Sequence, residues 1–234
     1  MQETVTLVIT SCGRLDLLKE TITSFFKFNT YPIEECIVVE DSGKDLDLSF
    51  LNSIVPTKLK ILINEKNIGQ INSIDRAYSE VTTPYIFHCE DDWEFYKLRF
   101  IEESFKILKA DSTVSNVWLR SHADTMGHPI DNTLIKKDNI EYFYMTTNYK
   151  GKWHGFSLNP GLRRMSDYLK FKPYAKLDVL VRKKKTMILG EVDLSIHYFQ
   201  QGYRGAITID KDGYVRHIGD KRHIPLPWEN NYAV

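Results

Sequence analysis

The chain has 234 residues, enough for one large domain with a substantial core. Hydrophobic residues make up 42% of it and charged residues 26%, which are ordinary values for a globular protein. The 31 basic and 31 acidic side chains cancel, so the net charge gives no reason to expect nucleic acid, a membrane surface or a polyanion as the partner.

The three cysteines, Cys12, Cys36 and Cys89, are an odd number at wide spacing. This pattern favours buried free thiols in a reducing compartment over a disulfide framework or a zinc cluster. The first residues lack the basic and apolar segments of a signal peptide, and no apolar stretch is long enough to span a bilayer. The expected compartment is therefore the cytoplasm.

The first half of the chain alternates strand-like and helix-like segments. Helical stripes of apolar residues run from Leu15 to Phe26, from Ile71 to Val81 and from Leu98 to Leu108. Near-continuous apolar strands of this kind, alternating with helices, indicate a Rossmann-like α/β fold with a mostly parallel central sheet flanked by helices on both faces. Strands are expected over residues 4–10, 35–41, 58–64 and 85–89.

The second half is less regular. A strand over 113–122, a helix over 192–201 and a strand over 203–209 are expected, with irregular structure and short strands in 123–165. The segment from residue 216 onward is basic and predicts a flexible arm.

Polar residues follow all four strands of the first half. Because ligands of open parallel sheets bind beyond the carboxyl ends of the strands, these residues predict a cleft. They are Thr10 and Ser11 with Arg14 just beyond, then Asp41, then Asn67 and Gly69, then Glu90, Asp91 and Asp92.

The residue types in this cleft suggest the ligand. Asp41 is suited to accept hydrogen bonds from a base or a ribose, and Gly69 opens a helix whose unpaired N–H groups favour an anion. The acidic run at 90–92 suits a hard cation. Together they describe a nucleotide diphosphate with a divalent metal. The absence of a P-loop or a Gly-rich dinucleotide fingerprint argues against a kinase, a nucleoside triphosphatase or a dehydrogenase.

Simpler interpretations remain open for each residue. Asp92 could be a helix cap and Asp41 part of an Asp-Ser-Gly turn. His88 and Cys89 are expected in the core.

Four stretches in order resemble the nucleotide-sugar half of family 2 glycosyltransferases of GT-A fold: VTLVITSCGRLDLLKETITSF, IVVEDSG, NEKNIGQINSIDRAYSEV and YIFHCEDDWEF. The resemblance covers roughly residues 4–110. It implies that Asp41 binds the base or ribose. The nucleotide pocket that it implies is lined by Thr10, Ser11, Arg14, Asn67, Gly69, Gln70 and Asn72.

The acidic run resembles the Asp-x-Asp motif of that family, with Glu90 in place of the first Asp. The resemblance implies that Asp92 is the metal ligand, that Glu90 or Asp91 faces the ribose or a metal-bound water, and that His217 completes the site. Mn²⁺ is expected, or Mg²⁺, because an imidazole ligand favours the softer ion. Lys221 and Arg222 would then lie near the diphosphate.

Residues 189–207 resemble the acceptor-side segment of the family. Glu191 is the first choice for the general base and Asp193 the second. A single base opposite the leaving group predicts inversion at the anomeric carbon. The candidate acceptor-binding residues Trp153, His154 and Asn159 could equally belong to an ordinary packed loop.

The sequence thus predicts a single GT-A domain, with a nucleotide-sugar half (1–112), an acceptor half (113–215) and a basic C-terminal arm (216–234). The expected function is metal-dependent transfer from a nucleotide diphosphate sugar, with uridine favoured, to a hydroxyl of a glycan or similar acceptor. The alternatives are a non-catalytic nucleotide-sugar or glycan-binding module and a sugar nucleotidyltransferase. The basic run 182–185 is expected to be solvated, with peripheral membrane contact as the minority alternative.

Overall fold

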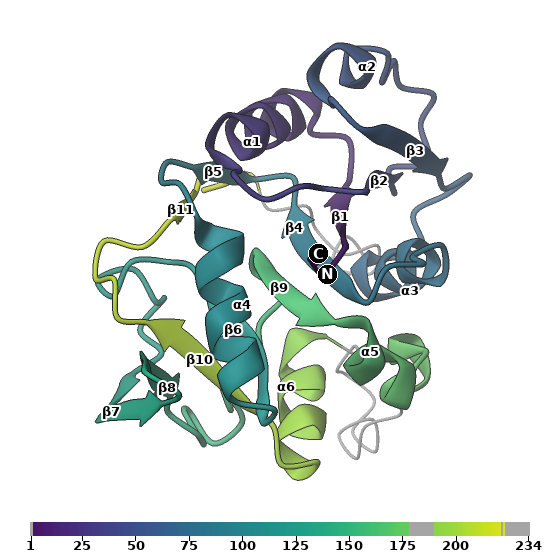
Figure 1. Ribbon diagram of the computed structural model, residues 1–234. Coiled ribbons are helices and arrows are strands. Elements are labelled where there is room, and N and C mark those ends of the chain that lie inside the picture. Colours follow the sequence, from purple (N-terminus) through teal and green to yellow (C-terminus); the bar gives the residue numbers. More distant parts are fainter. Residues whose placement is uncertain (1, 178–189, 221, 223–234) are drawn as a thin grey trace.

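The structure is a computed structural model that describes residues 2–177, 190–220 and 222. Its central sheet has the strand order β3-β2-β1-β4-β9 (Figure 1). The first four strands pair in parallel, and β9 runs antiparallel to β4. Their bounds are β1 Val5–Ser11, β2 Glu35–Glu40, β3 Lys58–Ile63, β4 Tyr85–Glu90 and β9 Gly161–Arg164.

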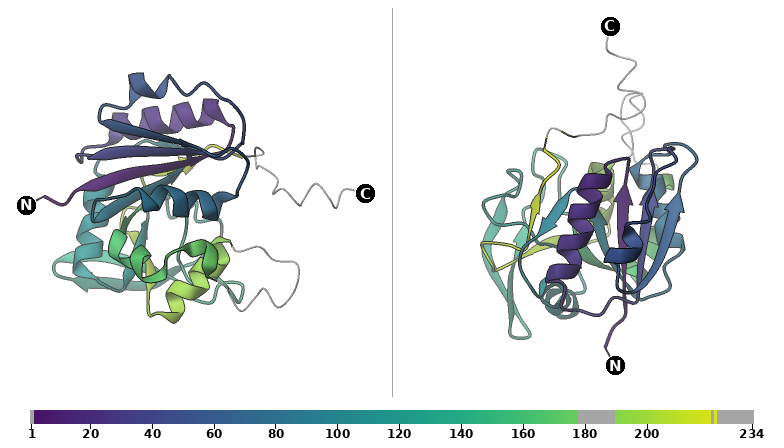
Figure 2. Two further views of the ribbon diagram at one scale, coloured as in Figure 1. Left: turned by 90° about the vertical axis from the view of Figure 1, so that its right-hand side faces the viewer. Right: turned by 90° about the horizontal axis from the view of Figure 1, so that it is seen from above.

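Helices cover both faces of this sheet, as the alternation of segments predicted. Leu7 of β1 packs in the same cluster as Phe25 of α1, whereas Val8 packs in the cluster of Ile74 of α3. Successive strand residues point to opposite faces, so a strand buried on both sides is apolar throughout. Figure 2 shows α1 (Leu15–Phe28) and α3 (Gln70–Ser79) on opposite sides of the sheet.

A second sheet, of order β6-β10-β8-β7, lies beside the first across α4 (Phe100–Ala110). Its strands β6 and β10 are parallel, and the hairpin β7–β8 adds antiparallel strands. The hairpin and β9 are the short strands expected within 123–165. The bounds are β6 Val114–Trp118, β7 Ile130–Lys137, β8 Ile140–Met145 and β10 Arg204–Thr208.

The prediction of a flexible arm from residue 216 onward is wrong for Arg216 and His217. Residues Val215–His217 form β11, which pairs antiparallel with β5 (Trp93–Phe95) and aligns His217 with Trp93. Val215 and Phe95 are buried, and this burial fixes the short strand. A three-residue strand is too short to leave a periodic pattern in the sequence. Residues 223–234 and the basic run 182–185 lie outside the described residues.

Three of the remaining helices contribute Tyr168, Tyr174 and Tyr198 to an aromatic cluster with Tyr78 of α3. Leu51 of the fourth helix packs instead in the cluster of Phe25 of α1. None of the helices within the described ranges is both long and apolar enough to cross a membrane. Cys36 and Cys89 are buried in strands, and Cys12 is partly exposed. The helices are α2 Leu51–Ile54, α5 Met165–Phe171, the 3-10 helix η1 Tyr174–Lys176 and α6 Glu191–Gln200.

Candidate active site

A pocket of about 490 Å³ lies at the carboxyl ends of β1, β2 and β4, where the polar strand ends predicted a cleft. Thirteen of the residues that the sequence nominated line it: Thr10, Ser11, Arg14, Asp41, Asn67, Gly69, Gln70, Glu90, Asp91, Asp92, Asn159, Glu191 and His217. Cys12, Ser73, Trp93, Arg120, Met126 and Gly219 complete the lining.

Arg14 holds two of the three consecutive acids. Its guanidinium forms an ion pair with Asp91, and its Nη1 lies 2.8 Å from Asp92 Oδ2. Cys12 N–H also donates to Asp91, at 3.3 Å. Burial raises the pKa of Asp91 to about 6, although the charge of Arg14 opposes this.

Asp92 also faces His217, whose Nε2 lies 3.2 Å from Asp92 Oδ2. Burial raises the pKa of Asp92, but the hydrogen bond from His217 and the charge of Arg14 outweigh it, so the pKa is lowered. The hydrogen bond with Asp92 correspondingly raises the pKa of His217. The pair therefore favours an ionised carboxylate beside a protonated imidazole, and a bound cation would take the place of that proton.

This pair fits a divalent cation that takes few ligands from the protein. Carboxylate oxygen and imidazole nitrogen are both ligands of Mn²⁺, and Asp92 and His217 meet at one pocket wall. Within residues 2–177, 190–220 and 222, no group of three or more His, Cys, Asp or Glu side chains could hold a metal ion. A bound diphosphate and water can supply further ligands.

Glu90 is oriented differently from its two neighbours. Its carboxylate accepts hydrogen bonds from Gln70 Nε2 at 2.6 Å and from Trp93 Nε1 at 3.2 Å. Burial, followed by the nearby charges of Asp92 and Glu191, raises the pKa of Glu90 to about 8. The structure thus groups Asp91 and Asp92 with Arg14, while Glu90 contacts the start of α3.

The adjacent acids Glu40 and Asp41 hold two different loops of the pocket. Glu40 is fully buried and accepts from Ser11 Oγ at 2.7 Å and from Gly13 N–H at 2.8 Å. Asp41 accepts from the N–H groups of Ile68 and Gly69, each at 2.8 Å, and from Asn64 Nδ2 at 2.6 Å. The N–H of Gly69, at the start of the helix that was expected to favour an anion, is therefore already taken by the carboxylate of Asp41.

Glu191 and Asp193, the two candidates for the base, occupy different places. Glu191 lines the pocket, and its Oε1 accepts from Leu158 N–H at 2.6 Å. Burial raises the pKa of Glu191, which favours a proton acceptor near neutral pH. Asp193 is absent from the described lining, and its Oδ2 accepts from Gly190 N–H at 3.2 Å. Asp193 therefore acts as a cap of α6.

The model of glycosyl transferase family 2 matches residues 6–167. The chain belongs to glycosyltransferase family 2. Its fold is GT-A, since its neighbours among solved structures are glycosyltransferases of that fold, at 12–14% identity. No curated protein matches its sequence.

The mannosyltransferase PcManGT from Pyrobaculum calidifontis, solved with GDP-Man and Mn²⁺, is similar at a TM-score of 0.66 and 14% identity over 94% of this chain. Residues 1–349 of S. aureus TarS are similar at 0.58 and 13% identity over 90%. Their complex with UDP is similar at 0.60 and 12% identity over 90%. This chain spans 59% of each of those chains, less than two thirds.

The other nominated residues are not part of the described pocket lining. Asn72 is exposed and bonds the carbonyl of Ile68, and His154 stacks on Phe199 at 4.1 Å. Trp153 is half-buried in a turn with Tyr149. Arg222 is exposed and pairs with Asp16, and Lys221 lies outside the described residues.

Arg120 is the main pocket residue that the sequence did not nominate. It is buried, stacks over the Trp93 ring at 4.9 Å and bonds Asp124 through Nε and Nη2. It follows β6 as the other polar residues follow β1 to β4. The rule that found the first four strand ends would have found it in the predicted strand 113–122.

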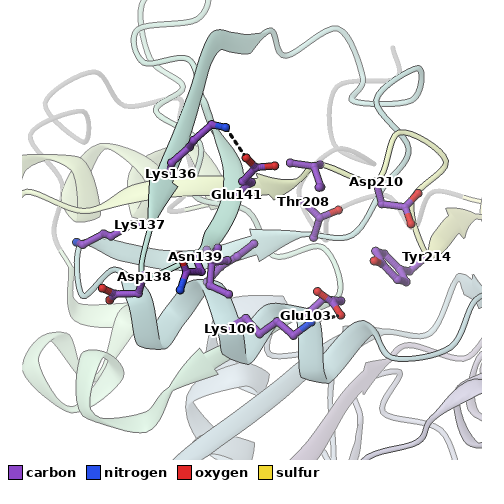
Figure 3. A pocket seen from close by; sticks show the side chains of 13 residues that line it. Glu103, Lys106, Lys136, Lys137, Asp138, Asn139, Glu141, Thr208, Asp210 and Tyr214 are labelled. Carbon is purple, nitrogen blue, oxygen red and sulfur yellow. Dashed lines mark hydrogen bonds and ion pairs between the residues drawn. The ribbon is translucent and has the colours of Figure 1, made fainter.

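A larger hollow of about 690 Å³ lies between α4, the β7–β8 hairpin and the residues after β10 (Figure 3). Most of its charged groups pair within the protein, as Lys136 does with Glu141 at 2.7 Å and Lys106 with Glu103 at 2.7 Å. It contains none of the nominated residues.

Proposed function

We propose that this glycosyltransferase is metal dependent and inverting, and that it moves a sugar from a nucleoside diphosphate, with UDP as the first choice, to a hydroxyl of a glycan or similar acceptor. The observation that carries the proposal is one pocket in which the Asp92–His217 pair and the Glu191 carboxylate are brought together. The first suits the departing diphosphate and the second suits the attacking hydroxyl.

The donor side is formed by the ends of β1, β2 and β4 and the start of α3. Thr10, Ser11, Asn67 and Gln70 offer hydroxyl and amide groups to a nucleoside. Asp41 serves this side by fixing the loop before α3, since its oxygens already accept three hydrogen bonds. Asp91 lies beside Arg14 and faces the same pocket, where a ribose is the expected partner.

Asp92 and His217 are the residues that would hold Mn²⁺ or Mg²⁺. When bound, such a cation neutralises the charge of a nucleoside diphosphate leaving group. The mannosyltransferase neighbour is in complex with Mn²⁺, which supports a divalent metal here. Arg14 supplies a fixed positive charge beside the same carboxylates.

Glu191 is the proposed general base. Its carboxylate is oriented by Leu158 N–H, and its raised pKa suits it to remove a proton from an acceptor hydroxyl. A base on the face opposite the leaving group leads to inversion. Arg120, Met126 and Asn159, which come from the second half of the chain, form the acceptor-side lining.

The test is the release of nucleoside diphosphate from a panel of UDP- and GDP-sugars, with and without Mn²⁺. We expect Asp92→Asn and Glu191→Gln to lower kcat by at least about 100-fold. Asp193→Asn is the matched control, and it should lower stability by about 1 kcal/mol while retaining activity. NMR of the product should show the inverted anomer. Donor binding with no release in the wild type would instead favour a binding module.

A further inference from the structure

Arg163 of β9 carries a buried charge that the catalytic residues do not explain. It is only 4% exposed, and among the described residues its guanidinium bonds one hydroxyl and two carbonyls instead of a carboxylate. Its neighbours are aromatic, with the Phe156 ring 5.3 Å from its Cζ. Burying a cation without an opposite charge costs folding free energy. The hydrogen bonds of the guanidinium therefore indicate which role could offset that cost.

The guanidinium holds one loop and one helix together. Nη2 donates to the carbonyl of Ser157 at 2.6 Å and to the carbonyl of Asn159 at 3.3 Å. Nη1 donates to the hydroxyl of Tyr78 on α3 at 3.1 Å. Arg163 therefore fixes the two peptide carbonyls that flank Leu158, and it ties them to a buried helix.

The other side of the same loop faces the candidate base. Leu158 N–H donates to Glu191 Oε1 at 2.6 Å, and Asn159 lines the pocket. A loop whose carbonyls are fixed on both sides of Leu158 has little freedom to turn this N–H away. A single peptide unit, with the Ser157 carbonyl at one end and the Leu158 N–H at the other, connects Arg163 with Glu191.

We propose that Arg163 is a positioning residue for Glu191, acting through the Ser157–Asn159 loop. The inference rests on the proposed function, in which Glu191 is the base. Arg163 touches no substrate. It holds the loop so that the Glu191 carboxylate faces the acceptor hydroxyl in one orientation.

The charges around Glu191 give the proposal a second readout. Burial raises the pKa of Glu191, and the charges of Arg163 on β9 and Arg120 after β6 oppose this. The hydroxyl of Ser157 and the N–H of Leu158 also favour the ionised form. Glu90 at the end of β4 is the facing acid. Loss of Arg163 removes one of these positive charges and loosens the loop that carries the Ser157 hydroxyl and the Leu158 N–H. Both changes should raise the pKa of Glu191 further.

A titration followed by ¹³C NMR of glutamate side-chain carboxyls tests this without substrate. The Glu191 resonance is identified by its loss in Glu191→Gln. We expect the titration midpoint of Glu191 to rise by about one pH unit in Arg163→Met and by less in Arg163→Lys, which keeps the charge. Arg164→Met is the matched control, since Arg164 bonds Val114 O at 2.7 Å and Asp111 O at 3.0 Å instead of the loop. An unchanged midpoint in Arg163→Met overturns the proposal.

Turnover separates positioning from general stability. With whichever donor the wild type cleaves, Arg163→Met should lower kcat by about 10-fold or more while the donor KM stays within about twofold. In the pH profile of kcat for Arg163→Met, the acidic limb should move to higher pH. Arg164→Met should lower the melting temperature but leave that limb in place. If Arg163→Met does not fold, Arg163→Lys carries both measurements. A wild type that cleaves no donor contradicts the proposed function, whereas the NMR titration still decides the contact between Arg163 and Glu191.

Discussion

Gly219 lies directly over the carboxylate of Asp92. A Cβ at Gly219 would lie 2.4 Å from Asp92 Oδ2 and 2.8 Å from its Cγ, and Ile218 N–H donates to the Asp92 carbonyl at 2.9 Å. The backbone after β11 therefore packs on the proposed metal ligand so closely that no side chain fits. This contact also places His217 opposite Asp92.

Gly219→Ala should move the Asp92 carboxylate and weaken the site that it forms with His217. We expect Mn²⁺-dependent cleavage of the donor to fall by about 10- to 100-fold, because small displacements of reacting groups have effects of this size. The measurement is the rate of nucleoside diphosphate release against Mn²⁺ concentration. Arg216→Ala, in the preceding strand β11 and paired with Glu94, is the control and should keep the wild-type rate. A Gly219→Ala enzyme with wild-type Mn²⁺ dependence contradicts the assignment of Asp92.

Arg14→Met should leave Asp91 and Asp92 without their cation. Breaking a buried ion pair from one side costs about 3 kcal/mol, so the melting temperature without metal should fall. Mn²⁺ alone should then raise the melting temperature more in the variant than in the wild type, because it replaces the missing charge. The measurement is thermal unfolding with and without Mn²⁺. Arg222→Met, which breaks an exposed pair with Asp16, should change stability by about 1 kcal/mol or less. Equal Mn²⁺ responses in Arg14→Met and wild type would argue against a cation site at Asp92.

Asp41→Ala should loosen the loop before α3. The N–H groups of Ile68 and Gly69 would lose their acceptor, which costs about 1–3 kcal/mol for each unsatisfied group. We expect weaker UDP binding by calorimetry together with lower stability in urea. Asp47→Ala, at an exposed turn, is the control. Reduced UDP affinity at wild-type stability would instead indicate that Asp41 touches the nucleotide directly.

The sequence predicted the central sheet and most of the pocket because both depend on local patterns. Strands buried on two faces are continuously apolar, and parallel strands bring their carboxyl ends to one edge. Thr10, Asp41, Asn67 and Asp92 follow directly from that rule, since each comes at the end of a strand or just after it.

What the sequence missed depends on contacts between distant segments. Gly219 lines the pocket only because β11 pairs with β5, more than a hundred residues earlier in the chain. Arg163 falls in the segment 123–165, for which the sequence predicted only irregular structure with short strands. Its hydrogen bonds to Tyr78 and Ser157 are visible only once β9 has joined the central sheet. His154 resembled a sugar-binding residue by type, but it stacks on Phe199 of α6 and does not line the pocket.

His88 should make the folded protein sensitive to mild acid. It is fully buried in β4, and neither ring nitrogen has a hydrogen-bond partner among the described residues. Burial, followed by the charge of Arg163, lowers the pKa of His88 well below its ordinary value. In the unfolded chain the imidazole takes up its proton near pH 6.5, whereas in the folded protein it stays neutral.

The neutral His88 therefore leaves the free energy of unfolding undiminished above about pH 6.5. Below that pH the unfolded chain binds a proton that the folded protein does not, and the free energy of unfolding falls by up to about 1.4 kcal/mol per pH unit. In His88→Phe the free energy of unfolding should decline less steeply between pH 6.5 and about 5. The measurement is urea unfolding across that range for both proteins. Comparison at pH 8, where the histidine is neutral in both states, isolates the effect of the substitution on packing. Parallel stability curves for the two proteins below pH 6.5 would contradict a neutral His88, because the charge difference between the folded and unfolded states would then come from other groups.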